Sequence, residues 1–247
     1  MPRALFQITG QDSHDFLQGL ITNDVNRLDK GLLYAALLTP QGKYIADFFL
    51  ARHGDTILLD VDATLADTLV ARLSMYRLRA DVQIAPSPLQ VSRGTTPPPA
   101  GSLPDPRHVA LGWRYYGKTA LPEDGTDWDS LRVAHIIPQS GIELTPDSYI
   151  LEAGFERLNG IDFRKGCYVG QEICARMKHK TELRKGLVLV DIDGPAETGS
   201  QITADGKPAG TLFTRSGSRA IAYLRHDRAG GEMRAGDATL RWNSPTL

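Results

Sequence analysis

The octapeptide KGCYVGQE, residues 165–172, is the stretch of the chain that says most about its fold. Gly166 and Gly170 bracket Cys167, and glycine permits positive φ angles and close backbone approach, so the pattern predicts a tight loop just before a helix. At a helix N-terminus the free amides and the helix dipole favour a thiolate, and Lys165 adds positive charge. The stretch therefore predicts a functional thiol at Cys167, and the alternative is a small buried cysteine that only packs.

Cysteine is otherwise scarce. Cys167 and Cys174 are the only two in the sequence, too few for a disulfide framework or for the complete ligand set of a structural zinc site. On one continuous helix their spacing of seven would separate them by about 10 Å along the axis, which is beyond disulfide reach. We expect two free thiols, no metal site built by this chain alone, and a packing role for Cys174.

The composition is that of a folded, near-neutral protein. Apolar residues make up 41% of the 247, and 28 Lys and Arg balance 29 Asp and Glu. No overall positive field is available to hold a nucleic acid or an anionic membrane. No run reaches the roughly 20 apolar residues of a membrane span, and residues 1–16 lack the apolar core of a signal peptide. These features predict a soluble cytoplasmic protein with no membrane contact and no specific nucleic-acid contact.

Apolar periodicity indicates an α+β protein. Residues 32–38 and 44–50 read as strands around the turn at 39–42, where Pro and Gly favour a tight reversal. Residues 53–112 contain a strand, a helix and a strand, followed by a loop rich in Pro, Ser and Gly. We predict that this segment is a separate inserted α/β domain.

The segments flanking the insert predict one split domain and one terminal domain. Residues 1–52 and 113–184 together have the order of a ferredoxin-like unit, with an amphipathic helix at 127–137. From residue 185 onward, short apolar strands alternate with Gly-rich turns, which is typical of a small β-barrel over residues 185–247. The sequence therefore predicts three domains.

Three segments resemble a known family. The octapeptide resembles the signature of the YgfZ family, which has mitochondrial iron-sulfur assembly relatives; residues 10–19 with 22–24, and residues 38–43, resemble two further blocks of it. The wider superfamily contains the glycine-cleavage T-protein. The resemblance implies a three-domain, T-protein-like cloverleaf around a central cavity of folate size, with tetrahydrofolate or a one-carbon derivative as the bound cofactor.

Two carboxylates are candidates for that cavity. Glu152, in the stretch LEAG, resembles the T-protein glutamate that holds the pterin, since a carboxylate can accept two N–H bonds; the alternative is an exposed surface carboxylate. Asp47 interrupts an apolar strand and needs a partner, so it lines the cavity or caps a sheet edge. The remaining folate-binding candidates are Lys165, Tyr168, Gln171 and Arg176.

Arg176 begins a basic run that ends at Lys185. Such a run meets the γ-glutamyl tail of folate or an acidic partner, and the alternative is a solvated helix end favoured by the helix dipole.

The resemblance implies an accessory protein that binds tetrahydrofolate and supports iron-sulfur cluster assembly or repair, for example in tRNA-modifying enzymes. Cys167 would be its redox or cluster-contacting residue, and iron-sulfur enzymes or assembly proteins its partners. The alternative is an aminomethyl or one-carbon transferase in which Asp47 orients the amine and Glu152 the pterin. T-proteins carry an Asp-Asp pair where this chain has Ala46-Asp47, which disfavours transferase chemistry. A third interpretation is an interaction scaffold that does not bind folate.

Overall fold

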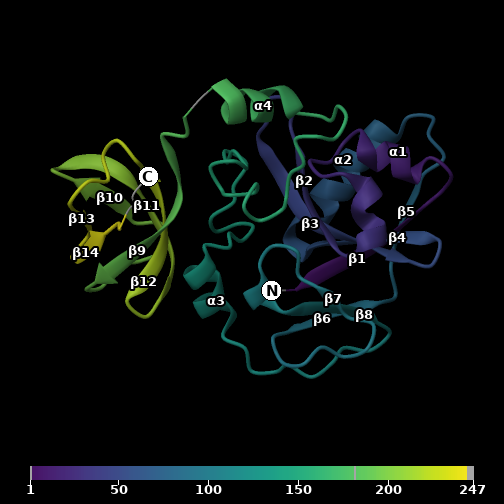
Figure 1. Cartoon of the computed structure of the whole chain (residues 1–247), viewed down its shortest axis with the longest axis horizontal. Coiled ribbons are helices and arrows are strands. Elements are labelled where there is room, and N and C mark those ends of the chain that lie inside the picture. Colours follow the sequence, from purple (N-terminus) through teal and green to yellow (C-terminus); the bar gives the residue numbers. More distant parts are fainter. Residues whose placement is uncertain (1, 181, 244–247) are drawn as a thin grey trace. The chain divides into compact units, whose positions relative to one another are not determined.

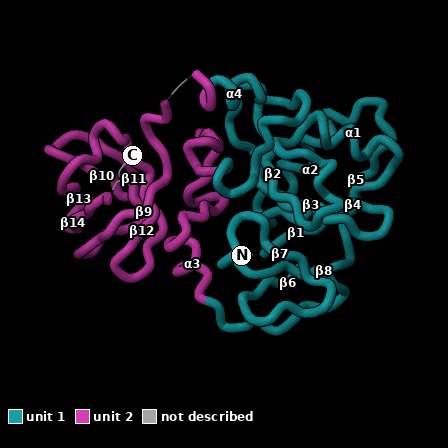
Figure 2. Tube along the Cα trace, in the orientation of Figure 1, with its two compact units in different colours: residues 1–126, 155–176 teal, residues 127–154, 177–247 magenta. Residues whose placement is uncertain are grey.

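The computed structural model describes residues 2–180 and 182–243 and divides the chain into two compact units (Figure 2). The first unit comprises Met1–Thr126 and Phe155–Arg176, and the second comprises Asp127–Gly154 and Met177–Leu247. Among the described helices, none combines the length and the apolar character needed to cross a membrane.

The first unit is built on a five-stranded sheet with the order β2-β3-β4-β1-β5, in which all neighbours are antiparallel (Figure 1). The predicted hairpin is confirmed, because β2 and β3 pair directly around the turn at residues 39–42. The strands are β1 (Arg3–Thr9), β2 (Leu33–Leu38), β3 (Tyr44–His53), β4 (Thr56–Asp62) and β5 (Gln83–Pro86).

The two faces of this sheet differ in chemistry because side chains alternate along a strand. On β3, Phe48 and Leu50 join the apolar core, which is covered by helices α1 (Ser13–Gln18) and α2 (Ala66–Arg77). The intervening Asp47 and Phe49 lie on the opposite face, beside Tyr34 of β2. Short 3-10 helices η1 (Val25–Lys30) and η2 (Ala63–Leu65) connect the elements.

The polar face carries a buried charge network. The carboxylate of Asp60 on β4 accepts hydrogen bonds from Arg3 Nε at 2.6 Å, from Arg114 Nη1 at 3.0 Å and from the Tyr116 hydroxyl at 3.0 Å. The Arg114 guanidinium also lies 3.8 Å from the centre of the Phe49 ring. A buried carboxylate needs such partners, and these partners bind a second, smaller sheet to the first.

That smaller sheet has the order β6-β8-β7 and falls where the sequence predicted an irregular loop. Its elements are β6 (Gln90–Gly94), β7 (Leu103–Pro104), η3 (Val109–Leu111) and β8 (Trp113–Gly117). The predicted domain boundaries also differ from the structure: β4 and β5, from the supposed insert at 53–112, flank β1 in the first sheet. Pairing between strands that lie far apart in the sequence leaves no local signal, so periodicity could not show it.

The second unit contains helix α3 (Trp128–His135) and a closed six-stranded barrel. The Asp127 side chain caps α3 by accepting from Ser130 N at 3.0 Å. The predicted helix and barrel are both confirmed, although residues 244–247 of the predicted barrel segment lie outside the described residues. The barrel strands, in the order β10-β11-β12-β9-β14-β13, are β9 (Lys185–Asp193), β10 (Gln201–Ala204), β11 (Lys207–Ser216), β12 (Arg219–Arg225), β13 (Glu232–Ala235) and β14 (Ala238–Arg241).

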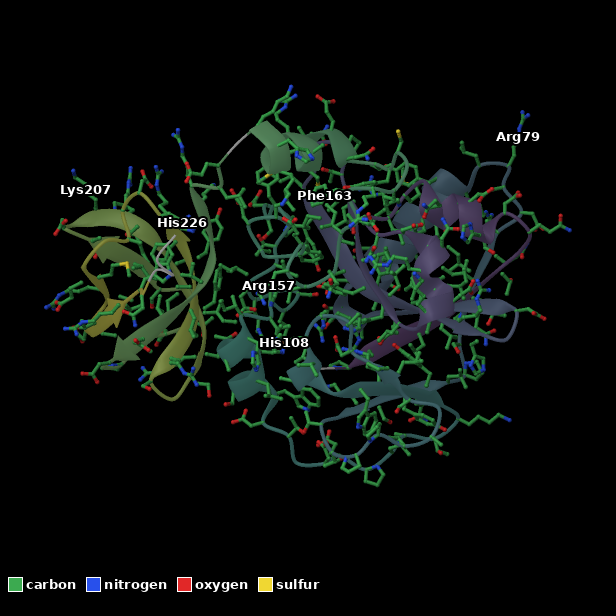
Figure 3. All side chains as sticks on the ribbon, viewed as in Figure 1. Arg79, His108, Arg157, Phe163, Lys207 and His226 are labelled. Atoms are coloured by element: carbon green, nitrogen blue, oxygen red, sulfur yellow. The ribbon has the colours of Figure 1, made fainter. Side chains whose placement is uncertain are left out.

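Two contacts fasten chain segments to this barrel. His226, labelled in Figure 3, follows β12; its Nδ1 lies 3.0 Å from Leu183 O and its ring lies 5.0 Å from that of Trp242. The second contact is a buried ion pair, in which Arg132 Nη2 on α3 donates to Glu143 Oε2 at 2.7 Å. The other oxygen of Glu143 accepts from Thr214 of β11.

Arg132→Met should lower the free energy of unfolding by about 3–5 kcal/mol, because Glu143 is then left as an uncompensated buried charge. Urea unfolding measures this difference. Arg176→Met is the matched control: its partner Glu172 is exposed, and an exposed pair contributes about 0–1 kcal/mol. Equal losses for the two variants would contradict the structural role of the buried pair.

Candidate functional site

Cys167 lies on a loop that begins near Phe163, labelled in Figure 3, and ends at helix α4 (Gln171–Lys180). The predicted loop before a helix is therefore confirmed. Cys167 is exposed, whereas Cys174 is buried within the helix. The separation argued for one continuous helix does not apply, because α4 begins four residues after Cys167.

The end of this loop packs against the β2–β3 hairpin turn at two glycines. Gly170 has φ +84°, and an added Cβ there would lie 2.7 Å from Thr39 O. Gly42 has φ +73°, and an added Cβ would lie 2.7 Å from Ile173 Cβ. Both positions therefore require glycine for conformation and for space. The segments 38–43 and 165–172, singled out separately in the sequence, are in contact.

Lys165 anchors the other end of the loop. Its Nζ donates to Gln18 O at 2.7 Å, at the last residue of α1, and to Ile21 O at 2.6 Å, just beyond that helix. Burial lowers the pKa of Lys165 to about 8. These bonds use two of the three ammonium protons, so Lys165 has a clear role in holding the loop, and its contact with folate stays a prediction. The segment at residues 10–19, which contains Gln18, is therefore also in contact with the segment at residues 165–172.

Tyr168 and Cys174 form the buried side of the loop. The Tyr168 ring lies 5.0 Å from Lys165 Nζ, and its buried hydroxyl has no hydrogen-bond partner among the described residues. Burial, with the neighbouring Cys174 thiol, raises the pKa of Tyr168, and burial raises the pKa of Cys174. Cys174 therefore packs, as predicted. The folate-binding role given to Tyr168 stays a prediction.

Asp47 is buried between two tyrosines on the polar face of the sheet. The Tyr34 hydroxyl donates to its Oδ2 at 2.9 Å and the Tyr44 hydroxyl to its Oδ1 at 2.6 Å. Burial and the Asp47 charge raise the pKa of Tyr34 well above its usual value. The predicted need for a partner is confirmed, and the sheet-edge alternative is wrong because β3 lies between β2 and β4.

A small cavity of about 150 Å³ borders Tyr34 in the first unit. Arg27 and Lys30 place two cations on its wall, while Leu32 and Leu33 form an apolar part. Ligand pockets for drug-sized molecules are usually about 300–1,000 Å³, so this cavity by itself does not enclose a folate-sized molecule. The sequence pattern gave no reason to single out these residues.

Glu152 belongs to the second unit, where the barrel holds it. Its side chain is only 10% exposed, so the exposed-carboxylate alternative is wrong. Oε2 accepts from the Tyr223 hydroxyl at 2.6 Å, and Oε1 lies 4.0 Å from Lys185 Nζ. Oε1 accepts no hydrogen bond from the described residues and can take an N–H from a ligand, which fits a pterin-binding role.

The last two candidates lie on α4. Gln171 is its first residue, and Arg176 pairs with Glu172 at 2.7 Å on the exposed surface. The candidates thus fall into three groups: the Cys167 loop, Asp47 with its tyrosines, and Glu152 with its barrel partners. Sequence reasoning missed Tyr34, two residues from the cross-strand neighbour of Asp47, a position that reaches it diagonally. Nothing in the sequence pointed to Tyr223.

Comparison with solved structures gives the fold. The aminomethyltransferase T of the glycine cleavage system from Bartonella henselae superimposes with a TM-score of 0.77, covering 98% of this chain and 83% of that chain at 14% identity. The fold is that of the T-protein. In addition, residues 184–247 match the family described as the CAF17 C-terminal beta-barrel domain, in agreement with the closed barrel.

Sequence relatives are named as iron-sulfur cluster assembly factors. The mouse protein, named iron-sulfur cluster assembly factor IBA57, mitochondrial, is 28% identical over 94% of this chain and 78% of its own length. The IBA57 homolog of Mycosarcoma maydis is 31% identical over 75% of this chain, and the match spans about half, 54%, of that protein. These similarities support the wider YgfZ-related superfamily, and the specific YgfZ family stays a prediction.

The predicted cytoplasmic location is wrong. The relatives from Mus musculus, Homo sapiens and Mycosarcoma maydis are all named mitochondrial. Composition and the length of apolar runs indicate whether a chain folds in water or crosses a membrane. They carry no information about the compartment in which the protein works.

Lys165→Met should remove a pH dependence of stability. The pKa of Lys165 is about 8 in the folded protein against an ordinary 10.5, so between these pH values the unfolded chain holds a proton that the folded chain has released. Stability therefore rises with pH in this window in the wild type. Urea unfolding at pH 7.5 and about pH 9.5 measures the slope, with exposed Lys118→Met as control. A slope unchanged in Lys165→Met would contradict the assignment.

Proposed function

We propose that this chain is a tetrahydrofolate-binding accessory protein that supports iron-sulfur cluster assembly or repair, with Cys167 as the residue through which it acts. The observation that carries the proposal is the exposed thiol of Cys167 on a loop fixed at both ends. The names of the relatives, which match most of this chain, supply the class of process.

The loop presents the Cys167 sulfur in a defined position. Lys165 holds the segment before it, and Gly170 holds the segment after it against the hairpin turn. An exposed, fixed thiol suits a soft metal ion or a thiol-disulfide step with a partner. An iron-sulfur cluster needs more thiolate ligands than one, and Cys174 is buried. A cluster at Cys167 would therefore be shared with cysteines of an iron-sulfur enzyme or assembly protein.

Glu152 supports the folate part of the proposal. Its carboxylate is nearly buried and has one oxygen left that can accept an N–H group. A charged acceptor in such surroundings gives a charge-assisted hydrogen bond of about 1.5–3 kcal/mol. Asp47 fits the transferase alternative less well, because both of its oxygens already accept from tyrosine hydroxyls. A formaldehyde-release or methylene-transfer assay with an aminomethyl donor separates the two functions.

Cys167→Ala should leave the protein folded and abolish its support of iron-sulfur enzymes. Cys167 is exposed, so the change removes chemistry at sulfur and little packing. The measurement is the activity of a cluster-dependent tRNA-thiolating enzyme in cells lacking the endogenous protein, together with the soluble protein level and thermal midpoint. Cys174→Ala is the control and should retain activity. Full activity of Cys167→Ala would show that the thiol is dispensable.

Glu152→Ala should weaken tetrahydrofolate binding by about 1.5–3 kcal/mol, the usual contribution of a hydrogen bond to a charged group. Calorimetry with tetrahydrofolate and its methylene derivative gives the dissociation constants. Glu123→Ala, at an exposed glutamate, is the matched control and should bind as the wild type does. An unchanged constant for Glu152→Ala would remove Glu152 from the site.

A further inference from the structure

The barrel holds Glu152 through its backbone as well as its side chain. Leu187 N on β9 donates to Glu152 O at 2.8 Å, and an added Cβ at Gly186 would lie 2.9 Å from the same oxygen. The main chain of Glu152 therefore lies directly against β9, an approach that a glycine at position 186 allows. The direction of the carboxylate is then set by what the side chain meets.

Tyr223 and Lys185 meet that carboxylate from the same face of the barrel wall. Tyr223 on β12 is paired with Leu187 on β9, and Lys185 lies two residues before Leu187, which makes it a diagonal neighbour of Tyr223. Lys185 Nζ lies 5.6 Å from the centre of the Tyr223 ring. Val188 and Leu224 on the same strands point into the apolar core, so Tyr223 and Lys185 share the outer face.

Tyr223 and Lys185 place the two carboxylate oxygens of Glu152 in different surroundings. Oε2 is occupied by the Tyr223 hydroxyl at 2.6 Å. Burial and the Glu152 carboxylate raise the pKa of Tyr223, so this hydroxyl keeps its proton and remains a donor. Oε1 is left as an acceptor, with the ammonium of Lys185 at 4.0 Å beside it as a donor. The surface thus offers an adjacent acceptor and donor.

We propose that Tyr223 is a positioning residue for Glu152, and that Oε1 of Glu152 and Nζ of Lys185 together recognise a ring amide, in which an N–H adjoins a C=O. This inference rests on the proposed folate function, because the pterin ring of folate carries such an edge at N3 and C4. A 4-amino pteridine has an amino group in place of the carbonyl oxygen and offers Lys185 no acceptor. A site with unpaired polar groups discriminates strongly against such an analogue.

The test of Tyr223 is a double-mutant cycle on binding. Calorimetry measures tetrahydrofolate affinity for wild type, Tyr223→Phe, Glu152→Ala and the double variant. Tyr223→Phe keeps the ring and should weaken binding about tenfold, the low end for a hydrogen bond to a charged group. In the Glu152→Ala background the same change should have no effect. Equal losses in both backgrounds would overturn the positioning role, because they would show that Tyr223 acts independently of Glu152.

The test of Lys185 compares folic acid with its 4-amino analogue. Wild type should prefer the 4-oxo ligand by tenfold or more, and Lys185→Met should bring the ratio close to one. Lys207→Met, at an exposed lysine elsewhere on the barrel, is the control. Binding of both ligands with no preference, or a preference unchanged in Lys185→Met, would overturn the inference and leave the folate function standing. No binding of tetrahydrofolate by wild type in the calorimetry would overturn both the inference and the folate function.

Discussion

The ammonium of Lys165, buried against the carbonyls of Gln18 and Ile21, is the interaction on which the candidate site depends. The carbonyls at the end of a helix need donors, and a lysine from a distant loop supplies them. The cost is the desolvation of a cation, visible in the pKa of about 8. Because this anchor sits two residues before Cys167, the thiol can be exposed while its loop stays fixed.

The polar face of the first sheet depends on the same kind of compensation. Asp47 and Asp60 both point away from the helix-covered core. Asp47 accepts from Tyr34 of the neighbouring strand and from Tyr44 of its own strand, and Asp60 accepts from Arg114 and Tyr116 of the smaller sheet. Breaking such a network leaves an unpaired buried charge, which is why the small sheet containing Arg114 is bound to the larger one. Hydrogen bonds and ion pairs to buried carboxylates thus stabilise this face of the sheet, whereas apolar packing stabilises the other face.

Features with a local pattern could be predicted from the sequence. The hairpin at 39–42, the helix capped by Asp127, and the barrel strands all follow from periodicity and turn chemistry within short windows. The placement of β4 and β5 on either side of β1 could not be predicted, because it depends on pairing between segments that lie far apart in the sequence. The small sheet was hidden by the Pro-rich composition around its strands.

The same division applies to the site. Asp47 could be recognised as a buried carboxylate in need of donors from its place in an apolar strand, yet the identity of those donors depends on the fold. Tyr223 is more than 70 residues from Glu152 and carries no motif, although it fixes the direction of that carboxylate. The two cysteines show the principle most clearly: they are the same residue type, seven positions apart, and differ because Cys167 precedes the first turn of α4 whereas Cys174 lies inside it. Gly170 lies between the two cysteines. It is the point at which the chain approaches the hairpin turn and at which the loop with the exposed thiol ends and the helix with the buried thiol begins.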